Sequence, residues 1–220
     1  MSTELHVPAR GAVTPRELGI GMRLSIHPHC DRFVEVILGA LGDAKAAGGD
    51  EGLVVETDEV SSYVGAVAAP AEQRLTDYLV AVITAASRRT GGGHVVAHVL
   101  LSRGCPGETT CDLSVTRLPA PAAVRVEATG ISAAAQWSLY PLLDGDTGGW
   151  GHMAHIAAAV ELARERAVVA RSTHYATTLT GDLADVLATA VDTWSRVGAR
   201  VPHVVTHVTV SVGSPSSAGK

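Results

Sequence analysis

Apolar positions follow two spacings along the chain, and each half uses them in the same order. Short apolar-rich segments bounded by proline, glycine or polar residues predict strands, and apolar residues three and four apart predict helices. The predicted strands of the first half are residues 20–27, 53–57, 60–66 and 94–102. The predicted helices are residues 31–47, which Asp31 would cap, and residues 70–87. The inward face of the first helix is predicted as Phe33, Val36, Ile37, Ala40 and Leu41.

The second half repeats this order, with a Gly-rich insertion at residues 144–149 in the loop after its first predicted strand. Its predicted strands are residues 135–140, 168–171, 174–179 and 203–211, and its predicted helices are residues 151–166 and 181–196. We therefore predict an α+β fold of tandem ferredoxin-like (βαββαβ) repeats, with antiparallel sheets and helices on one face. The predicted boundaries are a flexible arm (1–19), repeat one (20–107), a linker (108–133) and repeat two (134–216).

The two halves also match residue by residue. Residues 94–107 align without a gap on residues 203–216, so that His94 falls on His203 and His98 on His207. A second anchor places Leu24-Ser25-Ile26-His27-Pro28 on Trp137-Ser138-Leu139-Tyr140-Pro141. Two anchors in the same order indicate a duplicated domain, which predicts two related sites.

Strand alternation indicates where polar groups gather. Residues 94, 96, 98, 100 and 102 share one face of their strand, as do residues 203, 205, 207, 209 and 211 of theirs. Helices cover one face of a ferredoxin-like sheet, so we expect these sets on the open face together with Ser25, His27, Ser138 and Tyr140. Two such faces are expected to close on each other, within the chain or between chains.

Composition narrows the class of protein. The formal charge of −5 and the pI near 6.0 give no footprint for nucleic acid. Three cysteines, an odd number without paired-ligand spacing, fit a reducing compartment better than a disulfide framework. The first twenty residues lack the apolar run of a signal peptide. We expect a cytoplasmic protein whose core is built mainly from alanine, valine and leucine, because aromatic residues make up only 4%.

Several short motifs, in order, resemble the YkoF family of thiamine- and hydroxymethylpyrimidine-binding proteins. The motifs are residues 23–28, 57–62, 102–109, 138–141, 174–176, 181–182 and 211–216. The resemblance spans about residues 20–216. It implies a homodimer that binds the pyrimidine moiety of thiamine without catalysis and without a cofactor. It also implies a role in uptake or salvage of thiamine precursors, including association with a transporter.

An aminopyrimidine pocket needs hydrogen-bond donors, acceptors and a surface on which the ring can stack. The candidate ligand-binding residues of the first half are Ser25, Asp58, Glu59, Ser61 and Ser62, with His27 or Tyr63 to stack. Those of the second half are Ser138, Thr173, His174 and Thr177, with Trp137 or Tyr140 to stack. Because the first half offers two carboxylates where the second has Thr173 and His174, we expect the first site to bind cationic thiamine better.

Two other functions stay open at this point. One is an enzyme acting on a small heterocycle, with His174 as general base or His27 in a metal site with His29 and Cys30. The other is a regulatory dimer that senses a small metabolite. We do not expect a metal site, because no second ligand cluster has zinc-like spacing. We expect His94 and His98, with their counterparts, to serve the shared fold as buried imidazoles hydrogen-bonded across the sheet. Cys105 is not expected to be a nucleophile, since Ser214 replaces it in the other half.

Overall fold

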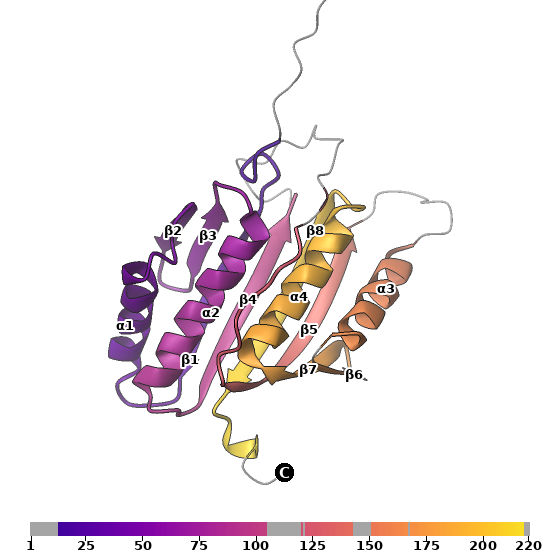
Figure 1. Ribbon diagram of the computed structural model, residues 1–220. Helices are drawn as coiled ribbons and strands as arrows, with labels where there is room; N and C mark the ends of the chain where they lie inside the picture. The colour runs from indigo at the N-terminus through magenta and orange to yellow at the C-terminus, as the bar shows by residue number, and fades with distance from the viewer. Residues whose placement is uncertain (1–12, 105–119, 121, 143–150, 167, 218–220) are drawn as a thin grey trace, which may run out of the picture.

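A computed structural model describes residues 13–104, 120, 122–142, 151–166 and 168–217 of the chain (Figure 1). The first repeat contains β1 (Gly21–Pro28), α1 (Phe33–Ala46), β2 (Leu53–Thr57), β3 (Ser62–Ala66), α2 (Ala71–Arg89) and β4 (Val95–Arg103). The second contains β5 (Ser132–Leu142), α3 (His152–Arg164), β6 (Val169–Thr173), β7 (Ala176–Asp182), α4 (Leu183–Gly198) and β8 (His203–Val212). A 3₁₀ turn, Pro215–Ser217, follows β8.

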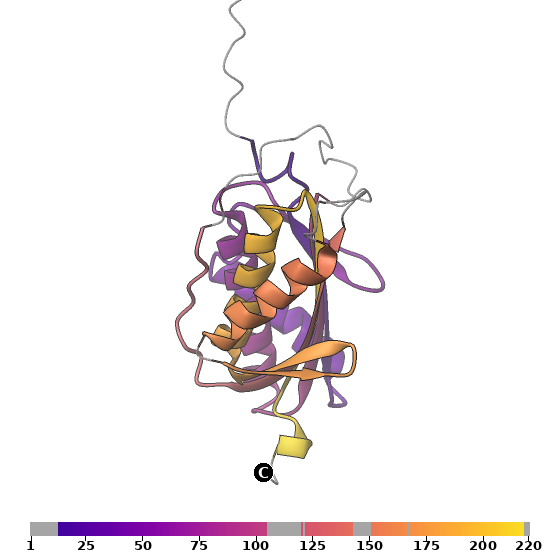
Figure 2. The ribbon, with the colours of Figure 1, turned by 90° about the vertical axis from the view of Figure 1, so that its right-hand side faces the viewer.

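All the strands join one antiparallel sheet in the order β2-β3-β1-β4-β8-β5-β7-β6. Each half of this order is the strand order of a ferredoxin-like domain, which confirms the predicted tandem α+β fold. The helices lie on one side of the sheet (Figures 1 and 2). The repeats meet edge to edge through β4 and β8, so their open faces do not close on each other within the chain.

The junction between the repeats has an approximate two-fold axis. Val99 of β4 lies opposite Val208 of β8, the residue that the internal alignment assigns as its equivalent. The register then runs symmetrically outward, with His98 opposite Thr209 and Leu100 opposite His207. The last strands therefore occupy equivalent places in the two repeats, as predicted.

Turns shift three predicted boundaries. Helix α1 begins at Phe33 and Arg32 is its cap residue, so Asp31 is not the cap. The β2–β3 turn includes Val60, which was predicted to lie in a strand. His174 likewise lies in the β6–β7 turn, where Tyr175 has a positive φ of 61°. In contrast, Asp182 caps α4 by accepting a hydrogen bond from the Ala184 amide.

The core lies between the helices and the covered face of the sheet. Trp137 and Trp194 are its largest fully buried side chains. Trp137 donates from its indole nitrogen to Thr206 Oγ1 (2.8 Å), and Thr206 in turn donates to the Ser138 carbonyl (2.8 Å). Trp137 is 2% exposed. The prediction that it stacks on a ligand is therefore wrong, because strand alternation points it away from Ser138 and into the core.

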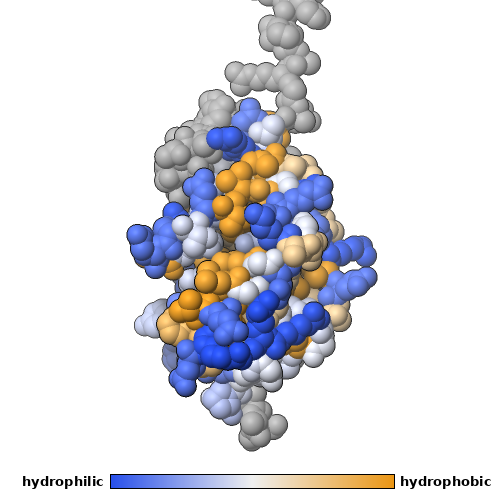
Figure 3. Space-filling view, turned by 90° about the vertical axis from the view of Figure 1, so that its left-hand side faces the viewer, coloured by the Kyte–Doolittle hydropathy of each residue, from blue (hydrophilic) through white to orange (hydrophobic). Residues whose placement is uncertain are grey.

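Helix α1 leaves apolar side chains at the surface. Phe33, predicted to face inward, is 50% exposed, and Val34 and Leu38 are exposed as well. Val36 and Ala40 are buried as predicted, together with Ala44. Ile37 and Leu41 are partly buried and pack against the core. Apolar surface is visible among charged residues on this side of the first repeat (Figure 3). Phe33 is excluded from the core because the helix starts there, at the rim of the sheet.

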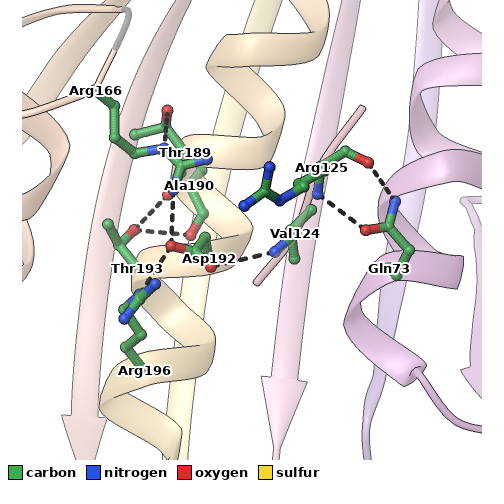
Figure 4. A network of polar contacts seen from close by, with 9 residues as sticks. All are labelled: Gln73, Val124, Arg125, Arg166, Thr189, Ala190, Asp192, Thr193 and Arg196. Atoms are coloured by element: carbon green, nitrogen blue, oxygen red, sulfur yellow. Dashed lines mark hydrogen bonds and ion pairs between the residues drawn. The ribbon is translucent and has the colours of Figure 1, made fainter. Parts of the chain in front are cut away.

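An extended segment, residues 122–128, lies between α2 and α4 (Figure 4). Gln73 of α2 bonds both the amide and the carbonyl of Arg125, at 2.9 and 2.7 Å. On the other side, Asp192 of α4 accepts from the Val124 amide (3.3 Å), from Arg166 (2.8 Å) and from Arg196 (2.9 Å). Asp192 is fully buried. Its carboxylate therefore ties the segment between the repeats to α4 and to the end of α3.

Candidate functional site

Polar side chains line the open face of the sheet in rows that cross both repeats. One row runs through cross-strand neighbours on five strands: Ser25, His98, Thr209, Gln136 and Thr178. These side chains are exposed or partly exposed, whereas their neighbours along each strand are buried. The open face is therefore the predicted polar surface, and it spans the junction between the repeats.

Five histidines form a row over the open face, which we call the histidine row: His29, His94, His27, His98 and His207. The ring centroids of His29 and His94 are 4.3 Å apart and stacked. Those of His27 and His98 are 5.3 Å apart, edge to face, and those of His98 and His207 are 6.3 Å apart and stacked. The row brings side chains from both repeats together at the junction.

Hydroxyl groups hold several of these rings. The His94 Nε2 and the Ser211 hydroxyl are 2.9 Å apart, and His98 Nδ1 is 3.0 Å from Thr209 Oγ1. His27 Nε2 lies 3.1 Å from the Ser25 hydroxyl. The predicted hydrogen bonds across the sheet are thus present for His94 and His98. The prediction that these imidazoles are buried is wrong: His98 is exposed, and His94, His203 and His207 are partly exposed, because no helix covers this face.

Burial and repulsion from neighbouring rings favour the neutral imidazole at His27 and His94. Partial burial lowers the pKa of His27 below its usual 6.5, and the neighbouring His98 and His29 lower it further. Partial burial also lowers the pKa of His94, again with help from His29. A neutral imidazole offers one donor and one acceptor. Among the residues that the structure describes, no three His, Cys, Asp or Glu side chains are placed to hold a metal ion.

A serine–histidine pair recurs in both repeats. Ser25 of β1 lies opposite His98 of β4, and Ser138 of β5 lies opposite His207 of β8. The internal alignment makes Ser138 the counterpart of Ser25 and His207 the counterpart of His98. The same donor and acceptor types therefore stand at the same register position on either side of the approximate two-fold axis.

The β2–β3 turn carries three of the predicted residues, and the fold already uses one of them. Asp58 accepts from the amides of Val60 (2.8 Å) and Ser61 (2.9 Å) and pairs with Arg23 (2.7 Å). These partners, the backbone amides above all, lower the pKa of Asp58 to about 2. The Ser61 hydroxyl also accepts from Arg23 (3.3 Å). Glu59, at the tip of the turn, is exposed.

Sequence reasoning did not single out Arg23 for the site. It lies opposite Tyr63 in the sheet, and its guanidinium carbon is 5.8 Å from the centre of the tyrosine ring. Arg23 is two residues before Ser25, so strand alternation alone places both on the same face. That spacing was the signal available in the sequence.

The β6–β7 turn is the counterpart in the second repeat. Thr173, the last residue of β6, and His174 in the turn are exposed. The Ser138 hydroxyl donates to the Tyr175 carbonyl (3.1 Å). Tyr140, in the place of His27, is 49% exposed on the open face. The structure thus brings Ser138 together with this turn, while no carboxylate stands at the positions that correspond to Asp58 and Glu59.

Two predicted residues lie away from the others. Ser62 and Thr177 are buried on the helix-covered side of the sheet, at 5% and 7% exposure. The hydroxyl of Ser62 is 2.8 Å from that of Thr57. Ser62 alternates with Val64, and Thr177 with Leu179, both core residues. The structure therefore separates Ser62 and Thr177 from the open-face group.

Comparisons with known proteins bear on both repeats. Residues 132–217 match the model of the YKOF-related family. Over 200 residues the chain is 29% identical to a protein of Bacillus subtilis (strain 168) named "Putative HMP/thiamine-binding protein YkoF", a match that covers 89% of this chain and 91% of that protein.

Two solved structures are also similar. A hypothetical protein from Methanocaldococcus jannascii matches with a TM-score of 0.33 and 23% identity, over 36% of this chain and 77% of that one. A protein from Streptococcus pneumoniae matches with a TM-score of 0.36 and 20% identity, over 40% of this chain and 92% of that one. No helix in the described part of the chain is long and apolar enough to span a membrane.

Proposed function

With its resemblance to the YkoF family confirmed, we propose that this chain binds thiamine or its hydroxymethylpyrimidine moiety on the open face of the sheet, and that it binds without catalysis. The recurring serine–histidine pair is the observation that carries the proposal. Ser25 with His98, and Ser138 with His207, give each repeat a hydroxyl and an imidazole at one register position. Two related binding sites per chain follow from this repetition.

The donors and acceptors of the open face suit an aminopyrimidine. Its ring nitrogens accept hydrogen bonds and its exocyclic amine donates them. The Ser25 hydroxyl and the neutral His27 imidazole can each donate and accept, so together they can satisfy both edges of the ring. In the second repeat, Ser138 supplies the hydroxyl, and the half-exposed ring of Tyr140 supplies a surface for stacking.

The turns beside the two sites differ in charge. Asp58 is already bonded to Arg23 and to two backbone amides, which leaves Glu59 as the exposed carboxylate of the first site. A carboxylate attracts the thiazolium cation of thiamine, and hydroxymethylpyrimidine lacks that cation. His174 stands in the corresponding turn of the second repeat. We therefore assign the stronger thiamine site to the first repeat.

The open face also suits a homodimer. Leu100, Tyr140 and Leu142 are large apolar residues exposed on it, at 42%, 49% and 46%. Covering them with the same face of a second copy removes apolar area from water, at about 25 cal/mol per Å². Such packing would also enclose ligands bound at the serine–histidine pairs. In this proposal the cytoplasmic dimer holds a thiamine precursor for salvage or for a transporter.

Calorimetric titration with thiamine and with hydroxymethylpyrimidine tests the proposal. Ser25→Ala and Ser138→Ala should each weaken one of two sites, by about tenfold for one lost hydrogen bond of roughly 1.4 kcal/mol. Ser132→Ala, on the same strand as Ser138 but outside the pairs, is the control and should leave both sites unchanged. Unchanged titrations for both pair variants would remove the open face as the site. Conversion of the ligand, detected by mass spectrometry, would replace binding by an enzymatic function.

A further inference from the structure

The two helix pairs differ in how the space between them is filled. In the first repeat, Arg89 of α2 donates from Nε and Nη2 to the two carboxylate oxygens of Asp43 on α1, both at 2.7 Å. The Arg89 guanidinium occupies the space that a Cβ at Gly39 would need. The ion pair therefore bridges α1 and α2 across the bare backbone of Gly39.

The second repeat lacks this bridge. The buried residues Val36, Ala40 and Ala44 of α1 correspond to His155, Ala159 and Ala163 of α3, which makes Ala158 the counterpart of Gly39 and Leu162 the counterpart of Asp43. On α4, the buried Leu183, Leu187 and Val191 correspond to Leu75, Leu79 and Ile83 of α2, which makes Val197 the counterpart of Arg89. Apolar residues thus replace all the parts of the bridge.

A cleft lies where the bridge is missing. It lies between α3 and α4, which Figure 2 shows one behind the other, and measures about 360 Å³. Its lining residues are His155, Ala158, Ala159, Leu162, Thr193, Arg196, Val197, Ala199 and Arg200. Ala158, Leu162 and Val197, the three counterparts of the bridge, are all among them. Its volume is within the range of small-molecule sites.

The charges at the cleft are of one sign. Arg196 and Arg200 line it, and no aspartate or glutamate is among its lining residues. The nearby Asp192 is engaged by the Arg196 Nε, by Arg166 and by the Val124 amide, so its charge is shared between two guanidinium groups. Arg200 is exposed and has no ion-pair partner in the described part of the chain. A cationic rim over an apolar floor favours an organic anion.

We infer that the α3–α4 cleft binds a small organic anion, with its apolar body against Ala158, Leu162 and Val197 and its carboxylate or phosphate group against Arg196 and Arg200. This site lies on the helical side of the sheet, away from the open face, and does not depend on the function proposed there. The duplicated copy supports the inference, because the same space in the first repeat is already filled by a guanidinium–carboxylate pair.

Nuclear magnetic resonance titration of the full chain with phenyl phosphate, benzoate and neutral benzyl alcohol tests the inference. The two anions should shift the amide signals of Ala158 and Ala199 in a saturable way, and whichever binds more tightly identifies the preferred head group. Benzyl alcohol should bind at least about tenfold more weakly, as expected for loss of a charge-assisted hydrogen bond. Equal binding of the alcohol, or no saturable shift with either anion, would overturn the inference.

Matched variants separate the cleft from general surface effects. Arg200→Gln should weaken the binding of phenyl phosphate about tenfold. The control is Arg88→Gln, which changes an exposed arginine of α2 and should not weaken binding. Ala158→Met places a longer side chain in the cleft and should abolish binding, while Ala157→Met, one residue away and outside the lining, should leave it intact. Retained binding in Ala158→Met, with its circular dichroism unchanged, would refute the assignment.

Discussion

Asp192→Asn is the sharpest test of how the two repeats are held together. The substitution keeps the shape of the side chain but removes the charge that pairs with Arg166 and Arg196. Breaking a buried ion pair costs about 3–5 kcal/mol, whereas an exposed pair is worth about 0.2–1 kcal/mol. Asp192 is 1% exposed, but its partners are 28% and 48% exposed. We therefore expect a loss of about 2–3 kcal/mol, between the two limits.

Urea unfolding followed by circular dichroism measures this loss. For a chain of this length, 2–3 kcal/mol corresponds to a fall of about 4–12 °C in Tm. Asp192 also accepts from the Val124 amide, so proteolysis within residues 122–128 should be faster in the variant. Glu165→Gln is the control, because it changes an exposed carboxylate at the end of α3, next to Arg166 in the chain. Its free energy of unfolding should stay within about 0.5 kcal/mol of that of the parent.

The refuting result is an Asp192→Asn variant that unfolds within about 0.5 kcal/mol of the parent, with an unchanged dependence on urea. The network in Figure 4 would then contribute no net stability, because desolvation of the carboxylate would cancel its pairing. A variant with normal stability but faster cleavage at residues 122–128 would also contradict the expected loss of about 2–3 kcal/mol. It would show that Asp192 anchors the segment alone and does not stabilise the whole sheet.

Three further predictions concern the open face. Measured by calorimetry, Glu59→Gln should weaken thiamine binding about tenfold and hydroxymethylpyrimidine binding less. The control, His174→Ala, should leave the first site nearly unchanged. If Glu59→Gln bound thiamine as tightly as the parent, the carboxylate would take no part in binding. Because the folded-state pKa of Asp58 is about 2, below its ordinary 3.8, its stabilising contribution is present above pH 3.8 and is lost as the pH falls toward 2. When the stability of Asp58→Asn is followed as the pH is lowered, this part of the loss should be missing. A stability curve identical to that of the parent would refute the prediction. The lowered pKa of His27 means that the folded state resists protonation of this ring, so stability should fall as the pH drops below 6.5. In urea titrations between pH 5 and 7, about the range in which histidine titrates, His27→Gln should make that fall smaller.

The duplication made the fold predictable, but not the way in which the repeats join. Apolar periodicity and the gapless match of residues 94–107 to 203–216 gave the order of elements and the equivalence of β4 and β8. An isolated repeat has an unpaired edge along its fourth strand, and the sequence of that strand does not state which partner covers it. The answer depends on long-range pairing, in which Val99 meets Val208. The alternation of apolar residues along this strand is compatible both with edge-to-edge pairing of the two repeats and with face-to-face packing of their sheets.

The candidate site was predicted best where strand alternation was applied, and least well at the turns. Ser25, His27, Ser138 and Tyr140 all lie on the open face. Ser25 and His27 are two residues apart on β1, as are Ser138 and Tyr140 on β5, so strand alternation places both members of each pair on the same face. Ser62 and Thr177 fail the same test, since each is two residues from a core side chain. The sequence contained this signal. It did not show the ion pair between Asp58 and Arg23, because Arg23 comes from another strand.

The two faces of the sheet have diverged to different extents between the repeats. On the open face, Ser25 and Ser138, and His98 and His207, keep the same chemistry at equivalent positions. On the helical face, an ion pair in one repeat corresponds to apolar residues and a cleft in the other. Packing alone does not require this difference, because the Arg89–Asp43 bridge shows that the fold can fill the space with its own side chains. If both proposals hold, the chain binds two classes of ligand, one on each side of the sheet.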